Sequence, residues 1–260
     1  MQAGLHDIWR TFSRPSLILF MAWSDVRARY KRSVLGPLWI TLSTAISVVG
    51  LGFVWSALFH LERKTYVPML TVGLILWQFI SSSIIESSAV FIRQNGLIKN
   101  LDLPISLHAA QLVLRQLINF LHNIPLYFIV VLLLGSPLNF NCLWALPAIV
   151  LTILNLFWIV LLIGILGARY RDLEYLIATT MPLLMFFSPV MYSPDNLPPT
   201  TGKFIWFNPL AHMIEIVRYP LLGQAPPAFL IVSNIALLLI GGAVTLYIFN
   251  KKRNRVALWV

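Results

Sequence analysis

The sequence predicts an all-α, polytopic membrane protein with six transmembrane helices, and three observations support this fold class. The 260 residues are 58% hydrophobic and only 11% charged, with a mean hydropathy of +0.81. A soluble domain carries about a quarter charged residues. Six long apolar runs alternate with short polar connections, and most cations flank these runs. No sizeable soluble domain remains, so residues 1–260 are interpreted as a single transmembrane domain.

Residues 1–34 form the predicted cytoplasmic interface segment. Their pattern favours an amphipathic helix on the lipid surface with Arg10 and Arg14 in water. The apolar positions are Ile8, Trp9, Phe12 and the run 17–23. A signal peptide is less favoured, because Asp25 and an arginine cluster follow the run instead of a small-residue cleavage site.

The first span follows the segment RARYKRSVLGPLW, residues 27–39. Residues 35–59 carry no charge. As a helix they reach about 37 Å at about 1.5 Å per residue, which is enough to cross a core of roughly 30 Å. Gly36 and Pro37 are expected in its first turn, where proline's missing N–H is harmless. The flanking cations predict a cytoplasmic N-terminus.

The other five spans follow from similar apolar runs. We predict them at 66–92, 106–134, 143–168, 175–192 and 229–250. Pro125 is an expected kink in the third, and the fifth contains Pro182 and Pro189. Spans 1–5 thus occupy 35–192, and residues 228–260 hold the sixth span and a basic cytoplasmic tail.

Residues 193–227 depart from this pattern. They hold seven of the 16 prolines, and their two apolar pieces, 204–207 and 210–222, are too short to span. We therefore predict a re-entrant hairpin that enters the outer leaflet. Glu215 and Arg218, three residues apart, are expected to stabilise this hairpin rather than to contact substrate.

The distribution of cations tests the six-span topology. Of the 19 Lys and Arg residues, 14 fall on the predicted inner side and four on the outer side, and Arg115 lies within the third span. This asymmetry favours cytoplasmic termini. A net charge of +10 can also indicate nucleic acid, but these cations lie beside apolar runs, so no nucleic-acid partner is predicted. The single Cys142 excludes a disulfide within one chain.

Two polar stripes at helical spacing lie inside predicted spans. They are Gln78, Ser82 and Glu86 in the second span, and Gln111, Arg115, Asn119 and His122 in the third. Charges in lipid usually pair or face a wet cavity. A structural Glu86–Arg115 ion pair is the favoured interpretation. A proton relay from Glu86 to His122, as in an ion-coupled secondary transporter, is the alternative.

Nothing in the sequence indicates a catalytic site. The phosphate-binding pattern GxxxxGK[ST] is missing, because Gly202-Lys203 lacks the upstream glycine. The five histidines are scattered, and neither a Ser/His/Asp pattern nor a metal-ligand cluster is visible. A membrane enzyme that acts on polyprenyl lipids would need clustered acids or histidines at one interface. The sequence therefore predicts no catalytic residues, no metal and no cofactor in this chain.

Four segments resemble the ABC-2 type permeases, the membrane subunits of polysaccharide-exporting ABC transporters. They are RARYKRSVLGPLW, ARYRDLEYL, FFSPVMYSPDNLPP and WFNPLAHMIEIVRYPLLG. A fifth segment, FIRQNGLIKNLDLPISLHAAQLVLRQLINFLHN, is most similar to the branch that exports O-antigen, the lipopolysaccharide O-chain. Exporters of capsular polysaccharide or teichoic acid with the same fold remain alternatives.

The resemblance implies a homodimer in the bacterial inner membrane. It also implies two copies of a cytoplasmic ATPase, which bind ATP and Mg, and a polyprenyl-diphosphate-linked glycan as substrate. A conduit wide enough for a polymer is hard to enclose with six spans, so a two-fold dimer is physically sensible.

Three sets of residues are candidates for this function. Guanidinium groups pair with phosphate oxygens, so a lipid diphosphate can be bound by Arg27, Arg29, Tyr30, Lys31 and Arg32. Aromatic faces pack on sugar rings, so a passage can be lined by Trp39, Ser43, Ser47, Trp55, Phe186, Phe187, Met191 and Tyr192. The ATPase can dock on Arg93, Asn95, Leu97, Ile98, Lys99 and Leu101. The alternatives are topology determinants, an interfacial aromatic belt and a simple turn, respectively.

Overall fold

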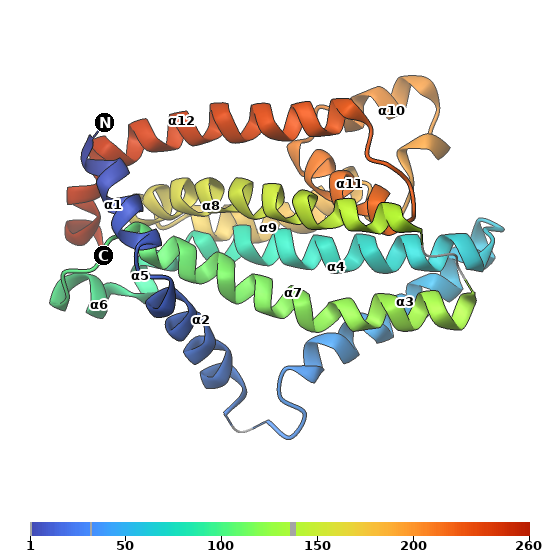
Figure 1. Ribbon diagram of the computed structural model, residues 1–260, viewed down its shortest axis with the longest axis horizontal. Helices are drawn as coiled ribbons and strands as arrows, with labels where there is room; N and C mark the ends of the chain where they lie inside the picture. Colours follow the sequence, from blue (N-terminus) through green and yellow to red (C-terminus); the bar gives the residue numbers. More distant parts are fainter. Residues whose placement is uncertain (1, 32, 136–138) are drawn as a thin grey trace.

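The computed structural model describes residues 2–31, 33–135 and 139–260, and the regular elements in these ranges are all helical (Figure 1). The long helices are α3 (Leu38–Leu58), α4 (Arg63–Ser87), α7 (Ser106–Leu134), α8 (Ala145–Arg169) and α12 (Ala228–Trp259). A short 3-10 helix, η1 (Phe140–Trp144), precedes α8. Within the described ranges, five helical segments are long and apolar enough to cross a membrane. The predicted all-α membrane class is therefore confirmed.

Helix α4 lies at the centre of the bundle. Its most apolar 18-residue window is 83% buried, against 17% for the corresponding windows of α3 and α12. It packs against α3, α7 and α8, and also against α9 (Leu173–Phe187). A helix that is apolar on every side is stable when protein surrounds it. The exposed apolar faces of α3 and α12 are instead suited to lipid.

The second predicted span, 66–92, is two helices rather than one. Helix α4 ends at Ser87, and α5 (Val90–Arg93) follows after Ala89 leaves the helical region with φ −106° and ψ 6°. The Ser87 and Ser88 hydroxyls donate to backbone carbonyls three residues earlier, and this competition with the helical ladder weakens the turn. A short helix α6 (Asn95–Asn100) then completes the inner connection.

The fifth apolar run forms a helix of 15 residues. Its length is about 22 Å, which is shorter than a bilayer core of about 30 Å. Helix α9 ends because Ser188, which precedes Pro189, is extended with ψ 147°. The predicted fifth span, and with it the total of six, therefore stays a prediction. Pro125, in contrast, lies within a continuous α7.

The proline-rich segment after α9 forms short helices at the end of the bundle opposite the termini (Figure 1). They are η2 (Pro194–Asn196), α10 (Pro199–Ile205) and α11 (Pro209–Leu221). Helix α11 is largely buried and packs against α4, α8 and α12. Its re-entrant position in a bilayer stays a prediction.

Glu215 and Arg218 on α11 form an ion pair, and each is 2% exposed. Arg218 also donates to the carbonyl oxygens of Pro189 at 2.5 Å and Tyr192 at 3.2 Å. Two of these partners are backbone groups that follow α9. The pair therefore holds the hairpin to the end of α9, a contact that helical spacing alone does not indicate.

The N-terminal segment forms α1 (Gln2–Phe12) and α2 (Pro15–Tyr30). Ile18, Ala22 and Val26 recur every four residues and are buried, and α2 packs against α7. The opposite face of α2 exposes large apolar side chains such as Phe20, which is 71% exposed. An apolar face directed away from the protein is suited to lipid. The predicted location at the membrane interface stays a prediction.

Both termini lie at the same end of the bundle, beside α5 and α6 (Figure 1). The Gly4 amide donates to Asn250 Oδ1 at 2.6 Å, and Arg253 donates to the Ala3 carbonyl at 2.9 Å. Helix α12 reaches Trp259, nine residues beyond the predicted end of the sixth span. The basic tail is therefore helical.

Candidate functional site

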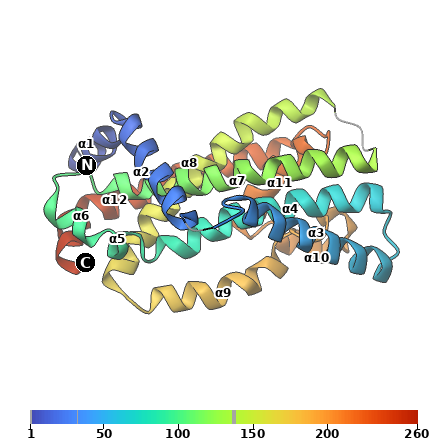
Figure 2. The ribbon, with the colours of Figure 1, turned by 90° about the horizontal axis from the view of Figure 1, so that it is seen from below.

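The connection between α2 and α3 projects from the side of the bundle (Figures 1 and 2). We call it the elbow; its described residues are 31 and 33–37. Gly36 has φ +55°, in the left-handed region that favours glycine, and Pro37 directly precedes α3. This geometry reverses the chain immediately after the basic cluster. The end of α2 and the start of α3 are therefore held on either side of one recess.

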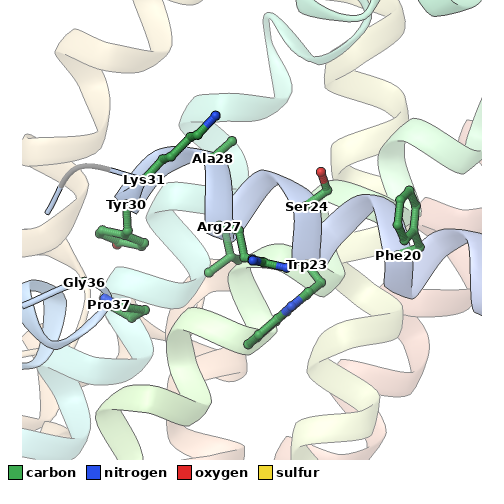
Figure 3. Close-up of a pocket in the computed structure, with 10 residues that line it drawn as sticks. Phe20, Trp23, Ser24, Arg27, Ala28, Tyr30, Lys31, Gly36 and Pro37 are labelled. Atoms are coloured by element: carbon green, nitrogen blue, oxygen red, sulfur yellow. The ribbon is translucent and has the colours of Figure 1, made fainter.

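The recess is a cavity of about 760 Å³. Its lining combines cationic, polar and aromatic side chains, chief among them Phe20, Trp23, Ser24, Arg27, Tyr30 and Lys31. Figure 3 shows Arg27 and Trp23 extending from the same side of α2, and Tyr30 directed towards Gly36 and Pro37. Arg27, on α2, and Lys31, directly after α2, both line this cavity, although Figure 3 shows the Lys31 side chain directed away from Arg27.

The cavity has an uncompensated positive charge. Neither Arg27 nor Lys31 forms an ion pair with a carboxylate in the described part of the chain. Burial raises the pKa of the Tyr30 phenol, although the adjacent Arg29 charge opposes this shift. The phenol therefore stays protonated near neutral pH and can donate a hydrogen bond. Two cations and one hydroxyl donor provide the chemistry that binds phosphate oxygens.

Arg29 does not belong to this cavity, although it lies between two residues that do. Its Nη2 contacts Glu86 Oε1 on α4 at 3.2 Å. Arg32 lies outside the described residues. The predicted diphosphate cluster is thus divided by the helical periodicity of α2, with Arg27, Tyr30 and Lys31 at the cavity and Arg29 turned towards the bundle.

Glu86 is the centre of a network of charges where α2, α4, α5 and α7 meet. Arg115 Nη2 forms an ion pair with it, and Arg93 Nη1 lies 3.7 Å from Glu86 Oε2. Gln116 Nε2 donates to Glu86 Oε1 at 2.9 Å. The side chains of Glu86 and Arg115 are only 15% and 16% exposed. The structure therefore brings together the two residues that were expected to pair.

Asp25 also belongs to this network, and its role there was not predicted from the sequence. Its Oδ2 lies 3.2 Å from Arg115 Nη1 and accepts a hydrogen bond from Gln111 Nε2 at 2.8 Å. The available signal was a single carboxylate inside an otherwise apolar and basic helix. Arg93 additionally lies 3.6 Å from Glu174 on α9, so the network reaches from the N-terminal helix to the fifth apolar run.

The contacts of His122 do not connect it to Glu86. Its Nδ1 lies 2.8 Å from the Ile118 carbonyl oxygen, and its own carbonyl accepts from the Thr41 hydroxyl at 2.9 Å. Within the described residues no hydrogen bond joins Glu86 to His122. The geometry favours the ion-pair interpretation over a proton relay.

The two polar stripes meet in a crevice of about 90 Å³ between α4 and α7. Its polar lining consists of Arg29, Gln78, Ser82, Gln116, Asn119 and Asn123. Gln78 Oε1 accepts hydrogen bonds from Asn123 Nδ2 at 2.9 Å and Thr44 Oγ1 at 3.1 Å. Gln78 and Asn123 therefore connect the two stripes, and the crevice is large enough for water.

The predicted passage residues lie on exposed surfaces of one chain. Those on α3 and α9 include Trp39, 52% exposed, Phe186, 63% exposed, and Phe187, 69% exposed, together with exposed Ser43 and Ser47. Trp55, Met191 and Tyr192 are half-buried. Both α3 and α9 pack on α4 (Figure 2), and the rest of the described chain leaves these faces uncovered. A single copy therefore does not enclose a passage with these residues.

The predicted docking residues lie on α5, α6 and the residue after α6, at the end that carries both termini (Figure 1). Arg93, Asn95, Lys99 and Leu101 are exposed, and Leu97 and Ile98 are half-buried. Helix α6 has only six residues and none of them is buried. This projection is accessible to a partner, and Arg93 connects it directly to Glu86 and Glu174.

Comparisons with known proteins agree with this architecture. A family model described as ABC-2 type transporter matches residues 16–222. Two proteins of Klebsiella pneumoniae named O-antigen export system permease protein RfbA are 27% and 26% identical over 246 residues, 93% of this chain and 93% of theirs. A protein of the same name from Myxococcus xanthus is 22% identical over 206 residues, 76% of this chain and 77% of its own. The chain therefore belongs to the ABC-2 type transporter family of membrane permeases.

Proposed function

We propose that this chain is the permease subunit of an ABC transporter that exports a polyprenyl-diphosphate-linked polysaccharide of the O-antigen type across the bacterial inner membrane. The likeness to O-antigen export permeases extends over 93% of the chain. The observation that carries the substrate class is the elbow cavity, where unpaired cations and exposed aromatic rings lie together. A lipid diphosphate presents both a concentrated negative charge and an apolar chain.

The elbow cavity suits such a headgroup in size and in chemistry. Its volume of about 760 Å³ lies within the range of small-molecule sites, roughly 300–1,000 Å³. The Arg27 guanidinium can form two parallel hydrogen bonds to phosphate oxygens, and Lys31 adds a second charge. Phe20 and Trp23 offer apolar surface on the adjacent turns of α2. The isoprenoid chain would then lie along the lipid-facing side of this helix.

The passage for the glycan is proposed to form between two copies of the chain. The exposed face of α3 combines Trp39 with the small residues Ser43, Ser47 and Gly50. Small residues permit close helix approach or leave an open wall, and aromatic rings pack on sugars without a fixed hydrogen-bond pattern. A two-fold dimer would cover the exposed faces of α3 and α9.

The energy is proposed to come from two copies of a separate cytoplasmic ATPase, which would bind ATP and Mg. The projection formed by α5 and α6 is the proposed docking point. A movement of Arg93 would shift or break its ion pairs with Glu86 on α4 and with Glu174 on α9. The charge network would thereby couple docking to the helix that carries Phe186 and Phe187.

Two other functions are alternatives to this one. Exporters of capsular polysaccharide or teichoic acid share the fold, and the glycan lost on deletion of the gene distinguishes them. An ion-coupled carrier would need Glu86 to exchange protons. Its carboxylate instead contacts Arg29, Arg93 and Arg115. Within the described residues no hydrogen bond connects it to His122.

The substrate assignment is tested by copurifying the chain with its ATPase and measuring stimulation of ATP hydrolysis by the lipid-linked glycan. The variant R27Q/K31Q should weaken the apparent affinity for the glycan by about tenfold or more, because two charge-assisted contacts are removed. The control R14Q removes an exposed cation of the same segment and should stay within about twofold. Equal stimulation in all three proteins would remove the elbow from the site.

The wider proposal is tested by deleting the gene and analysing surface glycan. Loss of an O-antigen-type polysaccharide, restored by the wild-type chain, is the expected result. Uphill transport by the isolated chain with an ion gradient and no ATPase would contradict the proposal.

A further inference from the structure

A second cavity, of about 320 Å³, lies between the inner ends of α8 and α12. Part of its wall is apolar and includes Leu166 and Ile248. The other part carries Arg169, Lys252 and Arg255, with Trp259 beside them. The cavity therefore changes from apolar to strongly basic along its length, at the end of the bundle that holds both termini.

The three cations of this cavity have no acidic partner. No aspartate or glutamate lines it, and none of the eight ion pairs in the described residues includes Arg169, Lys252 or Arg255. Neighbouring Arg253, in contrast, lies 3.7 Å from Asp7. Three like charges around one recess repel each other, and an anion inside the recess would relieve that repulsion.

Trp259 is held at the edge of the cavity. The Arg169 guanidinium lies 5.6 Å from the centre of its ring, and Arg171 Nη2 donates to its carbonyl oxygen at 3.1 Å. Tryptophan side chains are enriched where a membrane surface meets water. Further along α12, Ile240 and Val244 are exposed and apolar. The basic recess thus continues into a surface that is suited to an acyl chain.

We propose that this recess binds the phosphate headgroup of an anionic membrane phospholipid, with its acyl chains along the exposed face of α12. Basic pockets between transmembrane helices on the inner side recognise such headgroups, because their phosphodiester is anionic and their chains remain in lipid. The site is built from α8 and α12, whereas the elbow cavity is built from α2 and α3. Its occupant is therefore a resident lipid rather than the transported one.

The test uses the full-length chain, purified in a neutral detergent and freed of lipid. Phosphatidylglycerol and phosphatidylcholine with identical acyl chains are titrated, and bound lipid is measured by native mass spectrometry. The wild-type chain should bind phosphatidylglycerol at least about tenfold more tightly. The affinity of the variant K252Q/R255Q for phosphatidylglycerol should be about 25-fold lower, because each cation removed should weaken binding by about fivefold.

Matched variants separate charge from fold. K251Q removes a cation from the same tail that lies outside the recess and contacts the Tyr247 hydroxyl at 2.6 Å, so its affinity should stay within about twofold. K252R/R255K retains both charges and should also bind like the wild type. R14Q removes an exposed cation outside both cavities and should leave phosphatidylglycerol binding unchanged.

Equal affinity for the two lipids would overturn the proposal. So would a loss of affinity in K251Q or R14Q equal to that in K252Q/R255Q, or full competition by inorganic phosphate. If K252Q/R255Q keeps its lipid but no longer copurifies with the ATPase, the recess is a protein contact and the lipid assignment is wrong.

Discussion

At the scale of single residues, Glu86 shows how charges are tolerated near lipid. Arg29, Arg93 and Arg115 approach its carboxylate from α2, α5 and α7, and Asp25 balances Arg115 on the other side. Buried ion pairs contribute little net stability, but removal of one partner leaves an uncompensated charge. The network is therefore a strong constraint on how these helices meet.

The first prediction follows from the cost of leaving a buried charge without its partner. Glu86→Gln should lower the free energy of unfolding by about 3–5 kcal/mol, because Arg115 loses its most buried partner. Denaturant unfolding in detergent, followed by circular dichroism, measures the change. Glu62→Gln is the control, since Glu62 is exposed and forms no ion pair within the described residues. A loss no greater than that of the control would show that the network does not stabilise the bundle.

Another prediction concerns a single close approach of two backbones. A Cβ atom built on Gly73 would lie 2.1 Å from the Val190 carbonyl oxygen, so Gly73→Ala should lower the unfolding free energy by about 1–3 kcal/mol. The same change at Gly242, where a Cβ atom meets nothing within 4 Å, should cause no loss. Thermal unfolding of both variants checks this, and equal stability would mean that the segment after α9 adapts freely.

At the scale of elements, the helices differ in how much of their surface the chain covers. Helix α4 is enclosed, α11 is held by Arg218, and α3 and α12 face outward. Helices α5 and α6 project at the end with both termini. Buried elements fix the scaffold, and the elements left exposed are the ones available for a second copy, an ATPase or lipid.

The projection formed by α5 and α6 is testable by a charge change. Lys99→Glu together with Leu101→Ser should reduce copurification of the ATPase by about tenfold or more, since both residues are exposed in or beside α6. Lys203→Glu makes the same charge change on α10 at the opposite end and should have no effect. Undiminished copurification of the α6 variant would place the docking surface elsewhere.

At the scale of the whole molecule, the termini, the basic tail, α5 and α6 gather at one end, and α10 and α11 at the other (Figure 1). The cations follow the same division, with 14 of 19 on the predicted inner side. Cations near span ends are retained on the cytoplasmic side. The shape and the charge distribution thus support the same orientation.

Labelling with a membrane-impermeant maleimide tests that orientation. Cys142, the single cysteine, lies in η1 at the end opposite the termini and should react in cells with a permeable outer membrane. In a Cys142→Ser background, Lys251→Cys should react only after the inner membrane is opened. The reverse pattern would invert the topology.

Much of this architecture was predictable from local composition. Transfer of a helix into lipid depends mainly on its own residues, so the apolar runs indicated the five long helices. The ends were less accurate, since α4 ends five residues before the predicted span and α12 ends nine residues after it. The pairing of Glu86 with Arg115 was also accessible, because two isolated charges at similar depth need partners. The break in the helix after Ser87 could not be predicted from the sequence. It depends on the Ser87 and Ser88 hydroxyls, which donate to carbonyls of the preceding turn, and on the close approach of Gly167 to the Ser88 carbonyl.

The sequence by itself determined that this is a basic, polytopic helical membrane protein, because hydropathy and charge are properties of each segment alone. Only the tertiary structure decided which cations are free. Arg27 and Lys31 line the elbow cavity while Arg29 is paired with Glu86, although all three belong to one short cluster. The reason is physical: neighbouring residues on a helix point in different directions, and the partner that each one meets is set by how distant segments pack.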